Sequence, residues 1–242
     1  KLSGLFHEEG MENIQVIPKA RIPIIKFKDP RSGLDVDISL DNRLAIHNSM
    51  MLKSYAQEER LQRLIQMVKY WASRRGINNA FDGTLSSYAW TLLSIQHAQL
   101  VQPPLAPNRQ QGAEANPITF KGTTYDVGYN DEHYATENNQ SLASLLISFF
   151  ERFATRWDWE NMVVSVRSGE ALLTKAKKWK HTGPLPLEVV TGADDGWMEH
   201  VMPIEDPFNH EHDLSRVVRA EGAMTIQNEF MRIIELLSKG YT

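Results

Sequence analysis

The sequence predicts an α+β fold in which a piece of β-sheet is followed by a mainly helical domain. β-Branched residues dominate from Ile14 to Leu40, where apolar and polar residues often alternate. From Leu44 onward the apolar residues recur at helical spacing instead. Because side chains on one face repeat every second residue in a strand and every third or fourth in a helix, this change of period marks the end of the sheet. We therefore expect two domains, residues 1–43 and residues 44–242.

The sheet portion contains a predicted β-hairpin, ARIPIIKFKDPRSGLDVDISL, from residue 20 to residue 40. Pro30 has the backbone angle that a turn needs, and Gly33 accepts a positive φ. Beyond the turn, Asp35 and Asp37 alternate with apolar residues, so a strand places both carboxylates on one face. Paired carboxylates on a strand can hold Mg²⁺ against a triphosphate. The alternative is a solvated strand face, which the spacing alone favours.

Four helices are predicted after the sheet. The first contains apolar residues at helical spacing from Leu61 to Ala72, with Gly76 as its C-cap, and the second covers residues 85–100. Prolines then break the chain into a long loop. A third helix begins at Ser141, a good N-cap, and a fourth covers residues 223–239. We expect a short strand in MVVSVRS, residues 162–168, and a loop at residues 181–206.

Composition limits the class of protein. The 242 residues are 42% hydrophobic and 23% charged, enough to bury a sizeable core. The net charge of −4 argues against a globally cationic nucleic-acid binder, although basic clusters occur at residues 60–75 and 175–180. The absence of cysteine excludes disulfides and thiolate zinc sites and is compatible with a reducing compartment. We expect an intracellular, cytoplasmic protein, with the nucleus or a mitochondrion as alternatives, and no membrane partner, since no run of about 18 apolar residues occurs.

Four motifs occur in one order along the chain: DISLDNRLAIHNS, QMVKYWASRRG, GTLSSYAW and PIEDPFNHEHDLSRVV. Together they closely resemble the Cid-type poly(U) polymerases and terminal uridylyltransferases, which belong with poly(A) polymerases among the DNA-polymerase-β-like nucleotidyltransferases. The resemblance runs from about residue 20 to residue 237. It implies that residues 1–43 are the remnant of a polymerase-β-like catalytic sheet. Residues 44–242 would then form the helical central and PAP-associated domain of a poly(A)-polymerase-type enzyme.

The resemblance implies roles for the residues of the first motif. Asp37 matches the third metal-binding carboxylate, the one that acts on the RNA 3′-hydroxyl, whereas Asp35 has no counterpart. Asn42 matches a residue that contacts the ribose, and Asn48 and Ser49 match the pair beside the sugar 2′-hydroxyl. The alternative for His47-Asn48-Ser49 is a helix N-cap, which the residues alone favour.

In the second motif, Lys69 matches a phosphate-binding lysine. Ser73 stands where the family often has a second lysine, and Arg74 and Arg75 beside it are weak candidates for RNA contact. The alternative for these cations is a solvated helix face. In the third motif, Ser87 matches a phosphate-contacting serine. Tyr88, which follows it, matches the tyrosine on which the nucleobase stacks. The alternative is a core tyrosine, which the residues alone favour.

The fourth motif resembles the nucleotide recognition motif, at residues 203–218. Asp206 matches an acid near the base edge, and His212 matches the position where uridylyl-adding members often carry histidine. A histidine over the base pocket leaves less room for a purine, which favours UTP over ATP. Asn209 stands where the poly(U) enzymes commonly have an acid. A metal cluster of His210, Glu211, His212 and Asp213 is a weak alternative.

One part of the family pattern is missing. The first two metal carboxylates of the family belong to an Asp-x-Asp after a Gly-Ser loop, and this sequence has no Gly-Ser dipeptide. The chain also begins at Lys1 without an initiator Met, which indicates a fragment of a longer protein. We therefore expect an N-terminal catalytic segment on the same or another chain. The alternative is a non-catalytic relative that binds RNA or proteins.

The predicted function is template-independent addition of uridylyl residues from UTP to RNA 3′ ends. The implied cofactor is Mg²⁺ or Mn²⁺, and the implied partners are UTP and the 3′ end of single-stranded RNA. UTP is expected in a cleft between the sheet and the helical domain. An adenylyltransferase is the alternative within the same class.

Overall fold

The computed structural model describes residues 1–18, 22–170, 172–173, 179 and 200–240. The chain divides into two compact units, Lys1–Ser49 and Met50–Thr242. Helix α2 (Arg43–Tyr55) runs across this boundary, so the division between domains at residue 43 stays a prediction. The basic cluster at residues 175–180, except Trp179, and the predicted loop at residues 181–199 lie outside the described residues.

The first unit contains a three-stranded antiparallel sheet. Helix α1 (Leu2–Glu8) precedes strands β1 (Glu12–Ile17), β2 (Ile24–Lys28) and β3 (Asp35–Ser39), which lie in that order. The predicted hairpin is confirmed as β2 and β3. Its turn is closed by the Asp29 carboxylate, which accepts hydrogen bonds from Arg31 N and Ser32 Oγ, and by Gly33 with φ +71°. Strand β1 adds a third strand that the hairpin prediction did not include.

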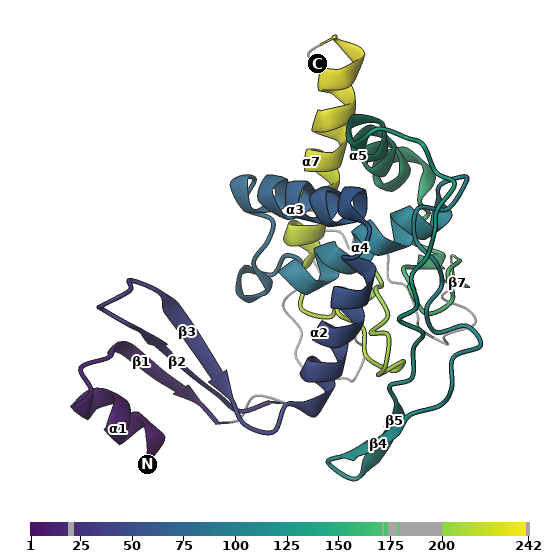
Figure 1. Cartoon of the computed structure of the whole chain (residues 1–242). Coiled ribbons are helices and arrows are strands. Elements are labelled where there is room, and N and C mark those ends of the chain that lie inside the picture. The colour runs from purple at the N-terminus through teal and green to yellow at the C-terminus, as the bar shows by residue number, and fades with distance from the viewer. Residues whose placement is uncertain (19–21, 171, 174–178, 180–199, 241–242) are drawn as a thin grey trace. The chain divides into compact units, whose positions relative to one another are not determined.

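The second unit is mainly helical, as predicted (Figure 1). Its helices are α3 (Glu59–Arg74), η1 (Ala80–Asp82), α4 (Ser87–Leu100), α5 (Leu142–Glu151), η2 (Arg152–Arg156) and α7 (Ala220–Ser238). Its short strands are β4 (Pro117–Phe120), β5 (Thr123–Asp126), β6 (Met162–Val163) and β7 (Leu172–Leu173). No described helix is long and apolar enough to cross a lipid bilayer.

Helix α4 is the central element of this unit. Every residue from Ala89 to Gln99 is buried, and the helix packs against α3 and α5. Aromatic side chains from α3, α4, α5, η2 and α7 meet beside it, with neighbouring ring centroids 4.8–6.2 Å apart. They are Trp71, Trp90, Phe149, Phe150, Phe153 and Phe230. Edge-to-face and tilted ring contacts of this kind add to the burial of apolar area. The core therefore holds α4 firmly in place.

The helix ends follow local sequence signals. Helix α4 begins at Ser87, two residues later than predicted, and its N-cap Ser86 accepts a hydrogen bond from Ala89 N through Oγ. Ser141 caps α5 as predicted. Gly76, with φ +69°, follows the C-cap Arg75 of α3. Helix α7 begins three residues before the predicted start. The predicted strand at residues 162–168 is only two residues long, because a turn follows Ser165.

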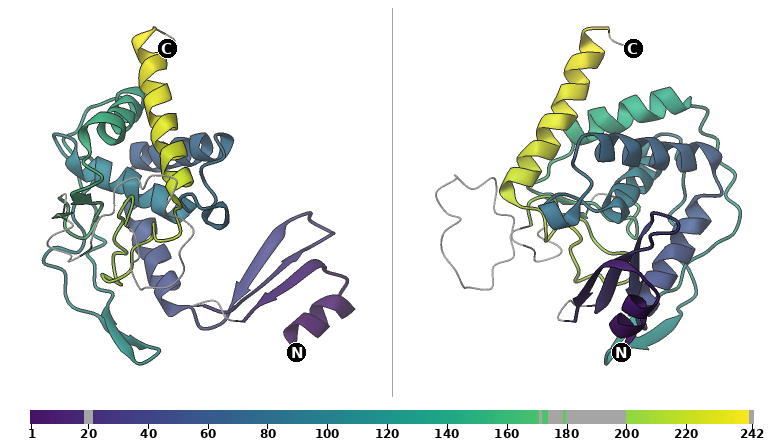
Figure 2. Two further views of the ribbon diagram at one scale, coloured as in Figure 1. Left: turned by 180° about the vertical axis from the view of Figure 1, so that it is seen from behind. Right: turned by 90° about the vertical axis from the view of Figure 1, so that its left-hand side faces the viewer.

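The long proline-containing loop is ordered by one buried arginine. The Arg109 guanidinium donates hydrogen bonds to the carbonyl oxygens of Ser54, Asn130 and Glu132. This loop also contains the hairpin β4–β5, which was not predicted and extends away from α3, α4, α5 and α7 in the left view of Figure 2.

Candidate functional site

Asp35 and Asp37 lie on one face of β3, as the alternation predicts. They stand opposite Lys28 and Lys26 on β2, and Lys26 Nζ is 3.0 Å from Asp37 Oδ2. Both aspartates are exposed. The strand face is therefore a cross-strand ladder of two acids and two bases, which is a stabilising arrangement by itself. This geometry agrees with the solvated-face alternative for Asp35, and the metal role of Asp37 stays a prediction.

The described carboxylates do not form a site for Mg²⁺ or Mn²⁺ by themselves. Among the described residues no group of three or more histidines or acids could hold a metal ion. Asp37 offers one carboxylate, and Lys26 already neutralises it. Divalent cations of this kind take several oxygen ligands. Asp37 alone therefore does not supply the ligands that the implied Mg²⁺ or Mn²⁺ would need.

The predicted ribose contacts lie on or next to α2. Asn42 immediately precedes the helix, and its carbonyl accepts a hydrogen bond from Ile46 N. Asn48 and Ser49 lie in the middle of the helix, where Ser49 Oγ donates to Ala45 O. The N-cap alternative for Asn48 and Ser49 is therefore wrong, because α2 already begins at Arg43. Their ribose roles stay predictions.

The predicted phosphate and RNA contacts on α3 and at its C-cap differ in their surroundings. Lys69 is half-buried, whereas Ser73 and Arg74 are exposed. The Arg75 guanidinium forms a bidentate pair with Glu229 on α7, at 2.6 and 2.7 Å. These hydrogen bonds lower the pKa of the Glu229 carboxyl. Arg75 therefore has a structural role between α3 and α7 that its sequence neighbourhood did not reveal.

Ser87 and Tyr88 occupy the first turn of α4. Ser87 is exposed, and its hydroxyl exchanges hydrogen bonds with the Asn78 side chain at 2.9 and 3.1 Å. Asn78 precedes a turn in which Asn79 Oδ1 accepts from Phe81 N, so the approach to α4 is fixed. The Ser87 side chain therefore faces solvent at the N-terminus of a rigid helix, where an anion is stabilised.

Tyr88 and Asp206 meet in space although they are far apart in sequence. Burial raises the pKa of the Tyr88 phenol, and the neighbouring Asp206 carboxylate raises it further. Tyr88 therefore stays a neutral phenol at physiological pH. Asp206 is itself buried, and its Oδ1 accepts hydrogen bonds from Phe208 N and Asn209 N. The structure thus brings together the residue expected to stack on the base and the acid expected at its edge.

The recognition segment, residues 203–218, places His212 and Asn209 beside Asp206. Asp206 N donates to His212 O at 3.0 Å, and His212 N donates to Asn209 O at 2.8 Å. Asn209 and His212 are half-buried. Four predicted nucleotide-binding residues, Tyr88, Asp206, Asn209 and His212, therefore lie in one connected region of the second unit.

The acid that follows His212 has a different role. The Asp213 carboxylate is buried, accepts hydrogen bonds from Ile204 N and Ser215 Oγ, and lies 2.6 Å from His200 Nδ1. The Trp179 ring stacks on His200 with centroids 4.6 Å apart. Asp213 therefore connects the beginning of the recognition segment, at Ile204, to its later part, at Ser215. This occupation does not support the alternative of a metal cluster at residues 210–213.

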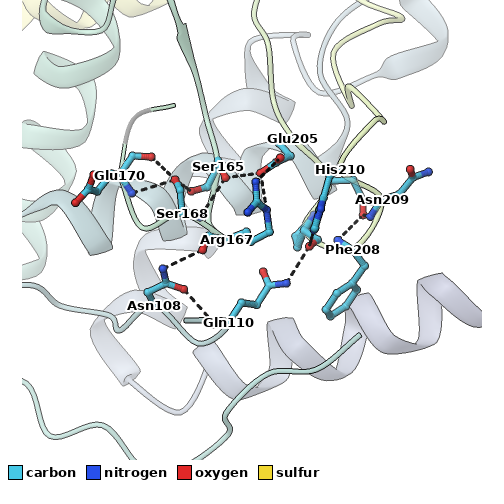
Figure 3. A network of polar contacts seen from close by, with 12 residues as sticks. Asn108, Gln110, Ser165, Arg167, Ser168, Glu170, Glu205, Phe208, Asn209 and His210 are labelled. Atoms are coloured by element: carbon cyan, nitrogen blue, oxygen red, sulfur yellow. Dashed lines mark hydrogen bonds and ion pairs between the residues drawn. The ribbon is translucent and has the colours of Figure 1, made fainter. Parts of the chain in front are cut away.

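Several residues that hold the recognition segment were assigned no role from the sequence (Figure 3). The Glu205 carboxylate pairs with Arg167, whose Nη2 is 2.9 Å from Oε1, and accepts a hydrogen bond from Ser165 Oγ. Gln110 Nε2 donates to Pro207 O at 2.9 Å. The only sequence signal was the position of Glu205 and Pro207 inside IEDPF. Their partners are distant in sequence, since Arg167 lies 38 residues from Glu205 and Gln110 lies 97 residues from Pro207.

Comparison with protein families gives two matches. Residues 1–57 match the central palm domain of mitochondrial-like poly(A) RNA polymerase. Residues 141–212 match the Cid1 family poly(A) polymerase domain. Together they include β3 and the start of the recognition segment.

Curated relatives and solved structures agree with these matches. The chain is 35% identical to terminal uridylyltransferase cid1 of Schizosaccharomyces pombe, over 95% of this chain and 58% of that protein. It is 30% identical to poly(A) RNA polymerase GLD2-A of Xenopus laevis, over 96% of this chain and 44% of that protein. The chain thus spans about half the length of these relatives.

Among solved structures, the chain superimposes on the crystal structure of the Cid1 poly(U) polymerase with a TM-score of 0.81 and 32% identity. That alignment covers 98% of this chain and 71% of that one. The fold is therefore that of the polymerase-β-like nucleotidyltransferases. The chain belongs to the Cid1 family of RNA nucleotidyltransferases, which includes poly(U) and poly(A) polymerases.

Proposed function

We propose that this chain forms the nucleotide-recognition part of a terminal uridylyltransferase, which adds uridylyl residues from UTP to RNA 3′ ends without a template. The observation that carries the proposal is the meeting of Tyr88 with Asp206, to which His212 is joined through the backbone. A ring for stacking, an acid at the base edge and a bulky imidazole together make a site that favours a small base.

Each of the chain's own residues has a part in the proposal. Tyr88 stacks on uracil, while Asp206 and His212 contact its edge. Lys69 on α3 and Ser87 at the N-terminal end of α4 hold the phosphates. Asn42, Asn48 and Ser49 contact the ribose, and Asp37 lies by the RNA 3′-hydroxyl.

Catalysis requires more carboxylates than the described residues provide. Two metal ions would clamp the attacking and leaving oxygens in this class of reaction. Asp37 alone does not hold them, so we propose that a Gly-Ser and Asp-x-Asp segment, on the same or another chain, completes the catalytic unit. The chain alone is then expected to bind nucleotide without extending RNA.

Structures of the relative support the choice of ligands. One Cid1 structure is a complex with the UTP analogue UMPNPP, and another is a complex with the short product ApU. A third is described as bound to Mg and 3′-dATP. These complexes are the basis for proposing UTP, an RNA 3′ end and a divalent cation as partners here.

Adenylyl transfer is the second candidate, because a specific residue favours it. Asn209 replaces the acid that is common among the poly(U) enzymes, and relatives such as GLD2-A are named poly(A) RNA polymerases. From a different class, a catalytically inactive RNA-binding or scaffold protein would retain the fold. It would not retain selective nucleotide binding.

Two measurements distinguish these functions. The first is isothermal titration of the chain with each of the four nucleoside triphosphates. The second is extension of a labelled single-stranded RNA with each triphosphate and Mg²⁺ or Mn²⁺, with the chain alone and after a Gly-Ser and Asp-x-Asp segment is restored. Selective UTP binding and a UTP ladder after restoration are expected. Selective ATP binding with an ATP ladder would establish the adenylyl alternative. The absence of any nucleotide binding would contradict both enzymatic candidates and favour the inactive relative.

A further inference from the structure

We propose that the ion pair between the half-buried Arg167 and the buried Glu205 positions the recognition segment and thereby sets the selectivity between UTP and ATP. This inference rests on the proposed function, because it concerns the same nucleotide site. Neither residue is expected to touch the nucleotide. Both act through Asp206, the neighbour of Glu205 in the chain, so they are positioning residues.

The first step of the argument is the burial of Glu205. Its side chain is 0% exposed, and its carboxylate has Arg167 Nη2 at 2.9 Å, Arg167 Nε at 3.3 Å and the Ser165 hydroxyl as partners. A buried carboxylate is strongly destabilising once its cation is removed. Arg167 therefore fixes the position of Glu205 and of the start of the recognition segment around it. Figure 3 shows Ser165 and Arg167 both pointing toward Glu205.

The second step is the rigidity of the segment that carries Arg167. Gln96 on α4 accepts a hydrogen bond from Ser165 N, and Gln99 on α4 donates to Val166 O at 3.0 Å. Asn108 Nδ2 donates to Arg167 O at 2.9 Å. Two buried glutamines of one helix therefore fix the backbone from which Arg167 projects. The same helix carries Tyr88 in its first turn, so Arg167 links the stacking residue to the edge-reading residues through α4.

The third step is the geometry of the arm. Glu205 N donates to Val164 O at 2.9 Å, and residue 204 pairs with residue 164 as an isolated parallel bridge. In an extended segment the side chains of successive residues point to opposite sides. Glu205 thus points to its anchor, while Asp206 points to Tyr88. A shift of the Glu205 anchor therefore moves Asp206, and His212 with it, because Asp206 N is bonded to His212 O.

The test measures nucleotide selectivity and stability together in the full chain. Dissociation constants for UTP and ATP are measured by calorimetry for the wild type, Arg167→Met, Arg167→Lys and Glu205→Gln. We expect the ratio of the ATP constant to the UTP constant to fall about 10-fold in Arg167→Met and Glu205→Gln. Arg167→Lys should retain part of the ratio, because it keeps the charge and loses the two-bond fork. It also supplies the comparison when Arg167→Met does not fold.

The control variant is Arg152→Met. Arg152 is a partly buried arginine that donates to His97 Nδ1 and Leu100 O, away from the recognition segment. Its loss should lower the melting temperature and leave the nucleotide ratio unchanged. If the Arg167 and Glu205 variants also lower only the melting temperature, their pair is purely structural and the inference is wrong.

The outcome for the wild type separates this inference from the proposed function. A wild type that prefers ATP would contradict the uridylyl assignment, yet a change of its ratio in Arg167→Met would still support positioning. A wild type that binds no nucleotide overturns both proposals.

Discussion

At the scale of single residues, His97 is a buried group whose ionisation is strongly opposed. Its Nδ1 accepts a hydrogen bond from Arg152 Nε at 3.0 Å, so its Nε2 carries the proton and faces Ser148 Oγ at 3.1 Å. Burial lowers the pKa of the imidazole to about 3, and the Arg152 charge contributes to the shift. His97 therefore stays neutral in the folded protein at any physiological pH.

This neutrality predicts a loss of stability in acid. The unfolded histidine titrates near 6.5 and binds a proton that the folded one does not, so the free energy of unfolding falls as pH decreases from about 6.5 towards 3. Between pH 7 and pH 5 the loss from His97 is about 2 kcal/mol. In His97→Gln this part of the pH dependence should disappear, as measured by urea unfolding at both pH values. Ile226→Val, a core substitution that keeps His97, should retain it. Equal pH dependence in His97→Gln and the wild type would show that His97 is not the cause.

Tyr88 gives a residue-scale prediction for the nucleotide site. Stacking of a base on an aromatic ring contributes about 1–3 kcal/mol, so Tyr88→Ala should weaken UTP binding about 5- to 150-fold. Tyr88→Phe keeps the ring and should bind UTP nearly as well as the wild type. The exposed Tyr70 of α3 is the control, since Tyr70→Ala should leave binding unchanged. Fluorescence titration with UTP measures all three. An equal loss in Tyr88→Phe and Tyr88→Ala would assign the effect to the hydroxyl instead.

The sequence revealed single residues only where a motif carried them. Tyr88 and Asp206 were matched through separate motifs, and the structure places them together. His97 lies in none of the motifs, and Glu205 lies inside one but was assigned no role, because burial by distant partners leaves no mark in local spacing. The capping interpretation of Asn48 failed for a related reason. Good capping residues are also tolerated inside a helix whose start is set a few residues earlier.

At the scale of elements, the start of α7 is packed unusually closely against the turn before α4. A Cβ atom on Gly222 would lie 2.0 Å from Gly83 O, and Arg219 N donates to the same oxygen at 3.0 Å. Gly83 itself has φ +80° and lies against the Arg219 side chain. Two glycines thus allow the backbone of α7 to approach the segment that leads to Ser87 and Tyr88.

We predict that Gly222→Ala destabilises the protein. Helix propensity alone would make alanine more stable by up to about 1 kcal/mol. The clash with a backbone oxygen outweighs this gain, and overpacking of this kind costs about 1–3 kcal/mol. Gly4→Ala in α1 is the matched control, because no atom lies within 4 Å of its Cβ position, and this change should not destabilise. Thermal unfolding of both variants measures the difference. A Gly222→Ala protein as stable as the wild type would mean that α7 moves away without loss.

Elements with a strong period were predicted well, and elements held by tertiary contacts were not. Helices α3 and α5 lie within a few residues of their predictions, since their buried faces and caps are local features. The hairpin β4–β5 was hidden in a proline-containing loop. Its ends are held by the Asp126 carboxylate, which accepts from Asn116 N and Gly128 N.

At the scale of the whole molecule, the fold class followed from the change of period at residue 44 together with the order of four motifs. Periodicity alone gave sheet followed by helices. It did not show which helix is central, because the all-round burial of α4 has no periodic signal.

The distribution of charge over the molecule predicts how it holds RNA. With a net charge of −4, RNA binding depends on a few local cations, and we expect weak and strongly salt-dependent association that suits distributive tailing. Long tails from single-hit primer extension by the completed enzyme at physiological salt would contradict this expectation.

The adjacent arginines of α3 provide the sharpest test of that expectation. Arg74 is exposed, whereas Arg75 is bound to Glu229 by two hydrogen bonds. We predict that Arg74→Gln weakens RNA binding and reduces the salt slope by about 0.7, the value for one phosphate contact on a single strand. Arg75→Gln should mainly lower the melting temperature, because α3 loses its link to α7. Fluorescence anisotropy of a labelled oligouridine at 50–200 mM salt, an approximate working range, measures the slope. A larger effect on the slope from Arg75→Gln than from Arg74→Gln would contradict this assignment, because it would make Arg75 the phosphate contact.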